Sequence, residues 1–318
     1  MSDEANMRGA GGMAPPDGTV VANPDGQVLR GRSALVRYLN LVKFPHTLFA
    51  LPFALLGVVA AARQAPAHFR TLALAVLAFT AARWVALGFN MIADLRYDRQ
   101  NPRNQSRELP RGGLTVRQAW GSVLVAGAIF FLAAGSINSL CARLSPLALL
   151  WVMGYSLAKR FTSWPHLWLG LSLAIAPVGG WLAVTGTWSR PWWTLAAVTL
   201  AVTTWVAGFD IFYSLPDEGF DRAQGLRSLV ARYGVARSLG IARGLHAVTV
   251  PALALFGLGA GLGAWYFSGV GVAAVILLYE HSLIRADDLR RLDAAFFTMN
   301  AVMSSTVFAF ALLDHLTR

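Results

Sequence analysis

The stretch TLALAVLAFTAARWVALGFNMIADLRYD, residues 71–98, joins a long apolar run to an acidic end. The run over 71–91 is long enough to cross a bilayer as a helix. Asn90, Asp94 and Asp98 follow at intervals of four residues, so a helix that continues through them places all three on one face. Carboxylates at the end of an apolar membrane helix cost free energy, so we expect them to bind a partner.

Similar apolar runs recur along the whole chain and decide the fold class. The 318 residues are 56% hydrophobic and only 14% charged, whereas an ordinary soluble domain is about a quarter charged. We therefore predict an all-α integral membrane protein, because helices satisfy their own backbone hydrogen bonds in lipid. The alternative, a soluble all-α protein with a large buried core, would need long polar helix faces, which these runs lack.

We expect nine membrane-spanning helices around a central cavity that opens to the cytoplasmic side. The predicted spans are residues 44–62, 71–91, 118–138, 144–160, 165–186, 192–212, 245–264, 266–281 and 294–313. If the N-terminus is cytoplasmic, sixteen Lys and Arg residues fall in the inner loops, residues 95–117, 159–160, 214–243 and 282–293. Only four fall in the outer loops, namely Arg63, Arg70, Arg143 and Arg190. The positive-inside rule therefore favours a cytoplasmic N-terminus and an external C-terminus.

The remaining composition excludes several classes of site. The net charge of +11 is explained by the inner loops, so we expect no nucleic-acid partner. Cys141 is the single cysteine, which excludes an intrachain disulfide, and the sequence has no Cys/His metal cluster. Residues 1–33 are rich in Gly, Pro and Asp and lack an apolar signal-peptide core, so we predict a disordered tail before a membrane domain at 34–318.

A second acidic cluster gives the chain a weak internal repeat. Gly208-Phe209-Asp210 matches Gly88-Phe89-Asn90, and each triplet closes an apolar run and precedes a basic loop. A parallel duplication with halves near 34–160 and 161–318 would place both clusters on the same side of the membrane. The second cluster, in GFDIFYSLPDEGFDR (208–222), contains Asp210, Tyr213, Asp217 and Asp221.

Oxygen ligands without Cys or His suit a hard cation. Mg²⁺ is commonly shared between carboxylates and the phosphates of a substrate, so two facing acidic clusters predict an Mg²⁺–diphosphate site. The predicted metal ligands are Asn90, Asp94, Asp98, Asp210, Asp217 and Asp221. A simpler interpretation is that the aspartates cap helices or pair with local arginines. It can explain any single aspartate, but it does not explain two clusters at matching helix ends.

Basic residues near both clusters suit a diphosphate. Arg and Lys bind phosphate oxygens and stabilise a departing diphosphate. The candidates are Arg107, Arg111, Lys159 and Arg160, although the positive-inside rule alone also places cations in these loops. Arg83 differs, because it lies inside the second predicted span, seven residues before Asn90 and on nearly the same face. A charge at that depth usually faces a polar cavity, so we expect Arg83 to bind an anionic group of the substrate.

Four motifs resemble those of the UbiA superfamily of membrane prenyltransferases. N-x-x-x-D-x-x-x-D stands here as Asn90-Asp94-Asp98, and D-x-x-Y-x-x-x-D-x-x-x-D stands as Asp210-Tyr213-Asp217-Asp221. Y-x-x-x-K-R stands as Tyr155-Lys159-Arg160, and R-P-L-P-x-G stands over residues 107–112 with Glu108 in place of the first Pro. The resemblance covers about residues 35–315, and the set of motifs is far more specific than one acidic motif alone.

Within the superfamily, the chain resembles the 4-hydroxybenzoate polyprenyltransferase branch. Residues 43–54, 279–289 and 296–300 resemble both that branch and the related prenyltransferases of futalosine-route menaquinone synthesis. The resemblance implies Mg²⁺-dependent transfer of a polyprenyl group from polyprenyl diphosphate to an aromatic hydroxy acid of the 4-hydroxybenzoate type, in ubiquinone or menaquinone synthesis. It also implies a UbiA-type bundle in the bacterial inner membrane, with the active site facing the cytoplasm.

The resemblance assigns roles to the residues named above. Asp94, Asp210, Asp217 and Lys159 would be catalytic, with Mg²⁺ bridging the diphosphate to the two acidic motifs. Residues that would bind substrate are Arg83, for the acceptor carboxylate, and Arg107, Arg111, Tyr155, Lys159, Arg160 and Tyr213. The two tyrosines could steady an allylic carbocation by cation–π contact.

Two alternatives stay open at this point. The acceptor could be 1,4-dihydroxy-6-naphthoate, because that acid also carries a carboxylate for Arg83, whereas no motif favours a tetrapyrrole. An ion-coupled transporter would instead place acidic residues near the bilayer midplane, and here they lie at helix ends beside basic loops. The expected partners are the two substrates and the lipid bilayer, with no obligate protein partner.

Overall fold

The computed structural model describes residues 29, 31, 33–102, 104–285, 289, 291–292 and 298–317, with the side chains of 45–49 left aside. Most of the predicted disordered tail, residues 1–33, therefore lies outside the described residues. Leu29 is an exception: its backbone N–H donates to Asn40 Oδ1 (2.8 Å) and its carbonyl accepts from Asn40 Nδ2 (3.1 Å). Asn40 thus holds the chain against the first helix, α1 (Ala34–Leu41).

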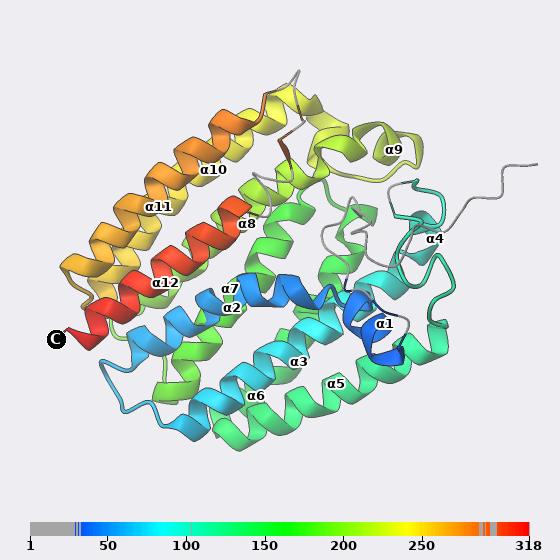
Figure 1. The fold of residues 1–318 in the computed structure, drawn as a ribbon. Coiled ribbons are helices and arrows are strands. Elements are labelled where there is room, and N and C mark those ends of the chain that lie inside the picture. The colour runs from blue at the N-terminus through cyan, green and yellow to red at the C-terminus, as the bar shows by residue number, and fades with distance from the viewer. Residues whose placement is uncertain are drawn as a thin grey trace, which may run out of the picture.

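Nine long helices build the described part of the chain, as the fold prediction requires (Figure 1). They are α2 (Phe44–Ala61), α3 (Phe69–Ala93), α5 (Val116–Ile137), α6 (Ser139–Gly154), α7 (Pro165–Thr185), α8 (Trp193–Ser214), α10 (Leu229–Ala260), α11 (Ala264–Leu283) and α12 (Asn300–Leu316). By length and hydropathy, 7 helices of the described chain can cross a membrane. The fully described part of α2, Ala50–Ala61, is a shorter apolar helix, and α12 has 17 residues. The protein is accordingly a multi-pass integral membrane protein.

Two helices begin at least five residues earlier than the hydropathy predicts, because polar caps set their first residues. The fourth predicted span begins at residue 144, whereas α6 begins at Ser139, where the Asn138 side chain accepts from the backbone N–H of Cys141 (2.8 Å). The seventh begins at 245 in the prediction, whereas α10 begins at Leu229 after the cap residue Ser228 and is kinked at Gly234, whose φ of 76° is not helical. The first turns of α10 are polar, and hydropathy alone therefore missed them.

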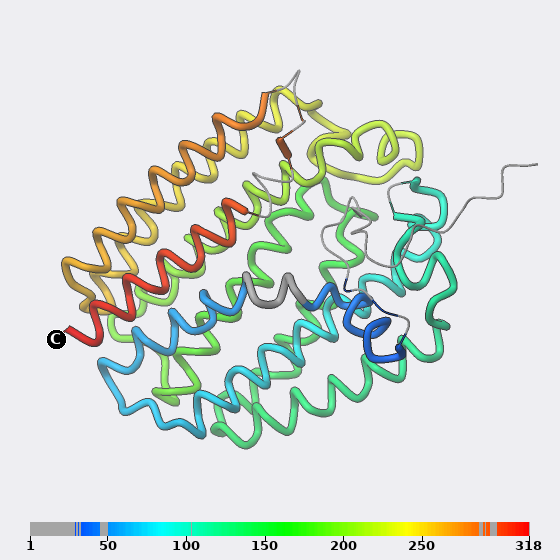
Figure 2. Tube along the Cα trace, in the orientation of Figure 1, coloured from blue at the N-terminus to red at the C-terminus, as the bar shows by residue number. Residues whose placement is uncertain are grey.

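Helices that are neighbours in sequence pack side by side and close into a ring. The order is α2, α3, α5, α6, α7, α8, α10, α11, α12, and α12 then packs against α2. Figure 2 shows this closure, with the red C-terminal helix beside the blue α2. The helices α2 and α7 also cross closely inside the ring. A Cβ at Gly57 would collide with the Pro177 backbone, and one at Gly180 with the Ala54 backbone.

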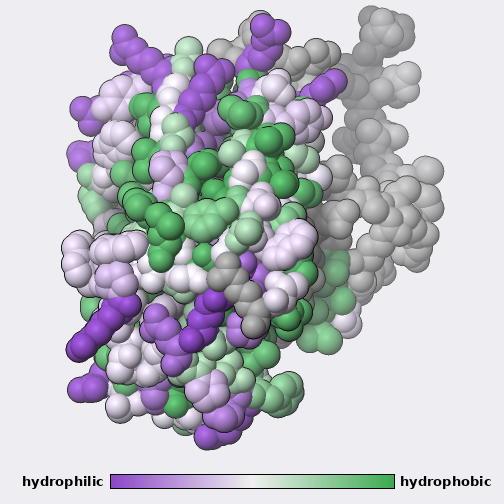
Figure 3. Space-filling view, turned by 90° about the vertical axis from the view of Figure 1, so that its left-hand side faces the viewer, coloured by the Kyte–Doolittle hydropathy of each residue, from purple (hydrophilic) through white to green (hydrophobic). Residues whose placement is uncertain are grey.

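The outer surface of the ring is apolar, as lipid requires. Exposed leucines stand on several helices, among them Leu124 and Leu132 on α5, Leu150 on α6, Leu258 on α10 and Leu278 on α11. In Figure 3, hydrophobic side chains gather across the upper half of the visible face, with hydrophilic ones above and below them. A soluble protein rarely leaves so much apolar surface exposed.

Both acidic clusters lie at one end of the bundle. The short helix α4 (Leu95–Asp98) follows α3, and α9 (Glu218–Ala223) follows α8. Figure 1 shows α4 and α9 at the end opposite the C-terminus. Two 3₁₀ turns complete this end: η1 (Tyr155–Arg160) after α6, and η2 (Leu215–Asp217) between α8 and α9.

Candidate active site

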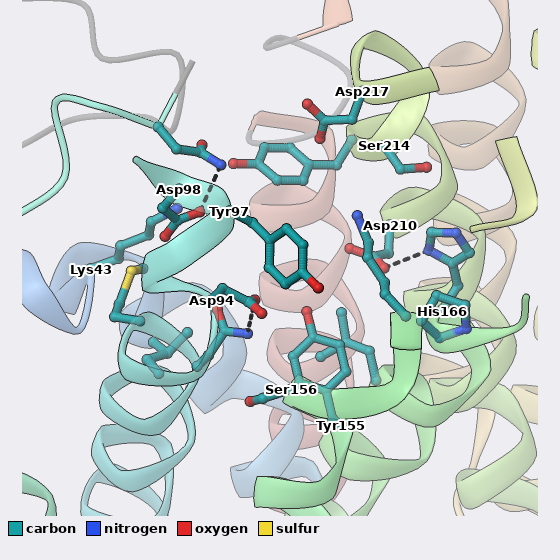
Figure 4. A pocket seen from close by; sticks show the side chains of 18 of the residues that line it. Lys43, Asp94, Tyr97, Asp98, Tyr155, Ser156, His166, Asp210, Ser214 and Asp217 are labelled. Atoms are coloured by element: carbon teal, nitrogen blue, oxygen red, sulfur yellow. Dashed lines mark hydrogen bonds and ion pairs between the residues drawn. The ribbon is translucent and has the colours of Figure 1, made fainter. Parts of the chain in front are cut away.

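A cavity of about 300 Å³ opens between the two acidic clusters (Figure 4). Its walls come from α3, α4 and the loop after α4 on one side, and from η1, α7, α8, η2 and α9 on the other. The cavity brings together twelve of the thirteen side chains that the sequence predicted for the site: Arg83, Asn90, Asp94, Asp98, Arg107, Tyr155, Lys159, Arg160, Asp210, Tyr213, Asp217 and Asp221.

The first acidic wall is built where α3 ends. The helix stops at Ala93, and Asp94 adopts φ −93° and ψ 1° before α4 resumes, so the predicted continuous helix is interrupted at that residue. Asn90 Nδ2 donates to Asp94 Oδ2 (3.0 Å). Asp98 is buried and accepts two bonds from Arg107 NH1 (3.1 and 3.0 Å). Burial, with a smaller contribution from the Asp98 charge, raises the pKa of Asp94 to about 6.

The second acidic wall is part helix and part turn, because Pro216 cannot continue the backbone hydrogen bonds of α8. Asp210 lies on the last turns of α8, Asp217 ends η2 and Asp221 lies on α9. Each carboxylate has a partner from another part of the chain. His166 Nδ1 lies 2.6 Å from Asp210, Asn101 Nδ2 donates to Asp217 at 3.4 Å, and Lys159 Nζ donates to Asp221 at 3.2 Å.

The donor set of the two walls fits a divalent cation that shares its ligands with a substrate. In the described part of the chain, no three His, Cys, Asp or Glu side chains are grouped so that they alone could hold a metal ion. Mg²⁺ usually takes only one or two carboxylates and completes its shell with water and substrate phosphates. The facing carboxylates therefore suit Mg²⁺ bound together with a diphosphate, and do not suit a preformed all-protein metal cage.

The four cations of the site come from three places in the fold. Lys159 and Arg160 lie on η1, Arg107 on the loop after α4 and Arg83 within α3. Arg160 NH2 lies 3.9 Å from Asp94 and donates to the Ala93 carbonyl at 2.7 Å. Lys159, Arg160 and Arg107 line the cavity beside carboxylates that would share an anionic substrate with them, whereas Arg83 lines it within α3.

Arg111 is the predicted site residue that the structure places elsewhere, since the described residues lining the cavity do not include it. Its guanidinium pairs with Glu108, whose side chain is buried and also accepts from Asn40 Nδ2 (3.3 Å). Glu108 is the residue that replaces Pro in the R-P-L-P-x-G motif. The replacement therefore adds a buried carboxylate that ties the loop to α1, and Arg111 neutralises this carboxylate.

The structure adds pocket residues that the motifs do not contain. His166 begins α7 next to Pro165, Asn101 and Asn104 follow α4, and Lys43 precedes α2 in a left-handed conformation (φ 45°). Asn104 Nδ2 donates to Asp98 Oδ1 at 2.9 Å. Asn101 and Asn104 stand directly after the first motif, which is a usable signal, whereas nothing local to His166 indicates that it meets Asp210.

The comparisons with known proteins agree with this architecture. The sequence profile of the UbiA prenyltransferase family matches residues 50–302. Curated relatives include the 4-hydroxybenzoate octaprenyltransferases of Nitrosospira multiformis, 30% identical over 72% of this chain and 77% of that protein, and of Vibrio campbellii, 31% identical over 77% and 85%. The chain belongs to the UbiA prenyltransferase family.

Solved structures give the same answer for the fold. A UbiA homologue from Aeropyrum pernix K1 superposes with a TM-score of 0.78 at 32% identity, over 85% of this chain and 98% of that one. A UbiA homologue from Archaeoglobus fulgidus bound to DMAPP and Mg²⁺ superposes with a TM-score of 0.68 at 21% identity, over 89% and 100%. The predicted UbiA-type bundle is thus confirmed.

Proposed function

We propose that this prenyltransferase transfers a polyprenyl group from polyprenyl diphosphate to 4-hydroxybenzoate or a closely similar aromatic hydroxy acid, in the synthesis of a respiratory quinone. The observation that carries the proposal is the single cavity that joins both acidic clusters, Lys159 and Arg107 at its mouth to Arg83 within α3. The curated relatives named 4-hydroxybenzoate octaprenyltransferase support the choice of acceptor.

The acidic walls would hold the diphosphate end of the donor through Mg²⁺. The ligands we propose are Asn90, Asp94, Asp98, Asp210, Asp217 and Asp221. Bound Mg²⁺ would supply positive charge that stabilises the diphosphate as a leaving group. The homologue from Archaeoglobus fulgidus, which binds DMAPP and Mg²⁺ on the same fold, supports this assignment.

The chain's own cations would complete the stabilisation of the leaving group. Lys159, Arg107 and Arg160 would donate to diphosphate oxygens as the allylic C–O bond breaks, which lowers the barrier most where charge develops. Their present partners, among them Asp221 and Asp98, are the carboxylates that would turn to Mg²⁺. Substrate binding would thus exchange ion pairs within the wall, and no new charge would be buried uncompensated.

The acceptor would lie deeper in the same cavity. Arg83 stands seven residues before Asn90 on α3, which is about 10 Å along the helix. Arg83 would hold the acceptor carboxylate and leave the ring facing the allylic carbon. Tyr155 and Tyr213 line the space between and would contact the carbocation. A carboxylate of the second acidic wall would accept the ring proton.

A prenylation assay tests the proposal. The purified protein in lipid nanodiscs receives radiolabelled polyprenyl diphosphate and Mg²⁺, with 4-hydroxybenzoate or 1,4-dihydroxy-6-naphthoate as acceptor. We expect prenylated 4-hydroxybenzoate, and prenylated naphthoate alone would assign the protein to menaquinone synthesis. Absence of product with both acids would overturn the proposal.

Arg83→Ala tests the acceptor half of the proposal. Loss of a charge-assisted pair with the carboxylate should raise the KM for the acceptor about 30-fold and leave the KM for polyprenyl diphosphate unchanged. Arg70→Ala is a suitable control, since Arg70 is an exposed arginine at the far end of α3. Equal increases in both KM values would show that Arg83 does not bind the acceptor.

A further inference from the structure

A buried polar cluster stands behind the α8 wall of the cavity. Glu280 on α11 is fully buried, and His246 on α10 and Asn300 at the start of α12 are 3% and 7% exposed. Ionisable side chains within membrane-spanning helices are costly and usually mark function. The cluster is not part of the acidic walls, so its role needs a separate explanation.

The cluster converges on one pocket residue, Trp205 of α8. The indole N–H of Trp205 donates to Asn300 Oδ1 (2.8 Å), and Asn300 Nδ2 donates to Glu280 Oε1 (3.3 Å). On the backbone side, His246 Nε2 lies 3.1 Å from the Trp205 carbonyl oxygen, and the missing Cβ of Gly208 leaves room for that ring. Trp205 is thus held at both its indole and its main chain.

Trp205 stands at the level where the new bond would form. It lines the cavity five residues before Asp210, which places it about 7.5 Å deeper along α8. Arg83 lies about 10 Å below the metal-binding end of α3. An aromatic acid whose carboxylate binds Arg83 would therefore present its ring beside Trp205.

The rings around Trp205 complete a rigid aromatic surface. Phe53 of α2 packs against Trp205 at a centroid distance of 4.5 Å, and Phe209 meets it edge-on at 5.1 Å. A planar acceptor gains from such a surface only if the surface does not rotate, because ordering a mobile side chain would cost part of the binding free energy. The hydrogen bonds through Asn300 prevent this rotation.

We propose that Glu280 is a positioning residue for the aromatic acceptor: through Asn300 it fixes the Trp205 indole, against which the acceptor ring packs opposite the allylic carbon. The inference rests on the proposed function, and it adds a chain of residues from α8, α11 and α12 to the acceptor half of the site. Polar contacts between membrane helices also hold bundles together. The experiment must therefore separate positioning from stability.

Glu280→Ala releases Asn300 and should raise the KM for the acceptor about tenfold, the loss expected for one buried hydrogen bond, with an unchanged KM for polyprenyl diphosphate. Glu280→Gln keeps an oxygen that can accept from Asn300, so the acceptor KM should return to within about threefold of the wild type. Trp205→Phe removes the indole N–H, and adding Glu280→Ala to it should cost little more, because the two changes cut the same chain.

Thr249→Val is the matched control. Thr249 Oγ1 pairs with Thr204 Oγ1 (2.9 Å) across the same α8–α10 interface, away from the Trp205 indole, so its loss should lower the melting temperature and spare both KM values. The positioning role of Glu280 is refuted if Glu280→Ala lowers only the melting temperature, as the control does. It is also refuted if Glu280→Ala raises the KM values for both substrates alike. If the wild-type protein prenylates neither acid, the proposed function is refuted, and the positioning role of Glu280 is refuted with it.

Discussion

Two buried ion pairs at opposite ends of the bundle look alike and act differently. Arg107–Asp98 at the mouth of the cavity and Arg63–Asp314 at the other end join side chains of similar burial at 3.0 and 2.9 Å. Arg63 also donates to the Gly261 and Asp314 carbonyls, and Asp314 accepts from the Gly263 N–H (2.8 Å). Asp98 instead faces a cavity lined by other carboxylates and cations.

The groups around each pair distinguish a structural ion pair from a functional one. Backbone groups, which cannot leave, surround the Arg63–Asp314 pair: Arg63 donates to the Gly261 and Asp314 carbonyls, and Asp314 accepts from the Gly263 N–H. This pair therefore fixes the junction of α2, α10, α11 and α12. The partners of Asp98 are side chains that can turn to another charge. Burial and distance are similar for the two pairs, so the groups around each pair distinguish them.

The largest effect should come from removing a carboxylate at the mouth. Asp94→Ala and Asp217→Ala should each lower kcat at least about a thousandfold, since the leaving group loses its metal-mediated stabilisation. Membrane insertion and the melting temperature without substrate should stay near the wild type. Near-normal turnover in either variant would remove that aspartate from the metal site.

Breaking the pair at the mouth should cost activity more than stability. Arg107→Ala should lower kcat/KM for polyprenyl diphosphate about a hundredfold, while Asn104 still donates to Asp98 in the folded protein. Arg111→Ala lies on the same loop but outside the described lining of the cavity, and should lower the same constant less than about threefold. An equal loss of kcat/KM in both variants would show that Arg111 belongs to the substrate site, as the sequence predicted.

The affinity of the cavity mouth for Mg²⁺ should also depend on pH. Because the pKa of Asp94 is raised to about 6, its carboxyl binds a proton below that pH and must lose it to bind Mg²⁺. The affinity for Mg²⁺ should be level above about pH 7 and should fall by about tenfold per pH unit below pH 6. Mg²⁺ titrations with a polyprenyl thiodiphosphate check this, and Asp94→Asn should flatten the profile.

Breaking the pair at the far end should leave the reaction almost untouched. Arg63→Ala strands a buried carboxylate at Asp314 and should lower the free energy of unfolding by about 3 kcal/mol. At a temperature where the variant is folded, both KM values should equal those of the wild type. Thermal unfolding in detergent measures the loss, with Arg70→Ala as a neutral control, and a specific loss of turnover would refute the structural role.

The sequence predicted the helices and the motif residues because both signals are local. Apolar runs give spans, and the four-residue spacing places Asn90, Asp94 and Asp98 on one wall even though α3 ends at Ala93. The hydrogen-bond partners of these residues, in contrast, come from distant parts of the sequence and cannot be read from a local pattern. Asp210 meets His166 and Asp217 meets Asn101 only after the ring of helices closes. Arg107 and Arg111 look equivalent in the loop, and the fold alone turns one of them away from the cavity.

Two glycines let the backbones of α2 and α7 meet below the cavity, so no side chain separates the two helices there. Ala50 and Leu173 are pocket residues, and in the turns below them Gly57 meets the Pro177 backbone and Gly180 meets the Ala54 backbone. On the proposed function, the water-soluble acceptor and the released diphosphate would pass the carboxylates. The polyprenyl chain of the donor would not fit within about 300 Å³ and would extend sideways between helices into lipid. The diphosphate and the polyprenyl chain of the donor would thus leave the site by different routes, one to water and one to lipid.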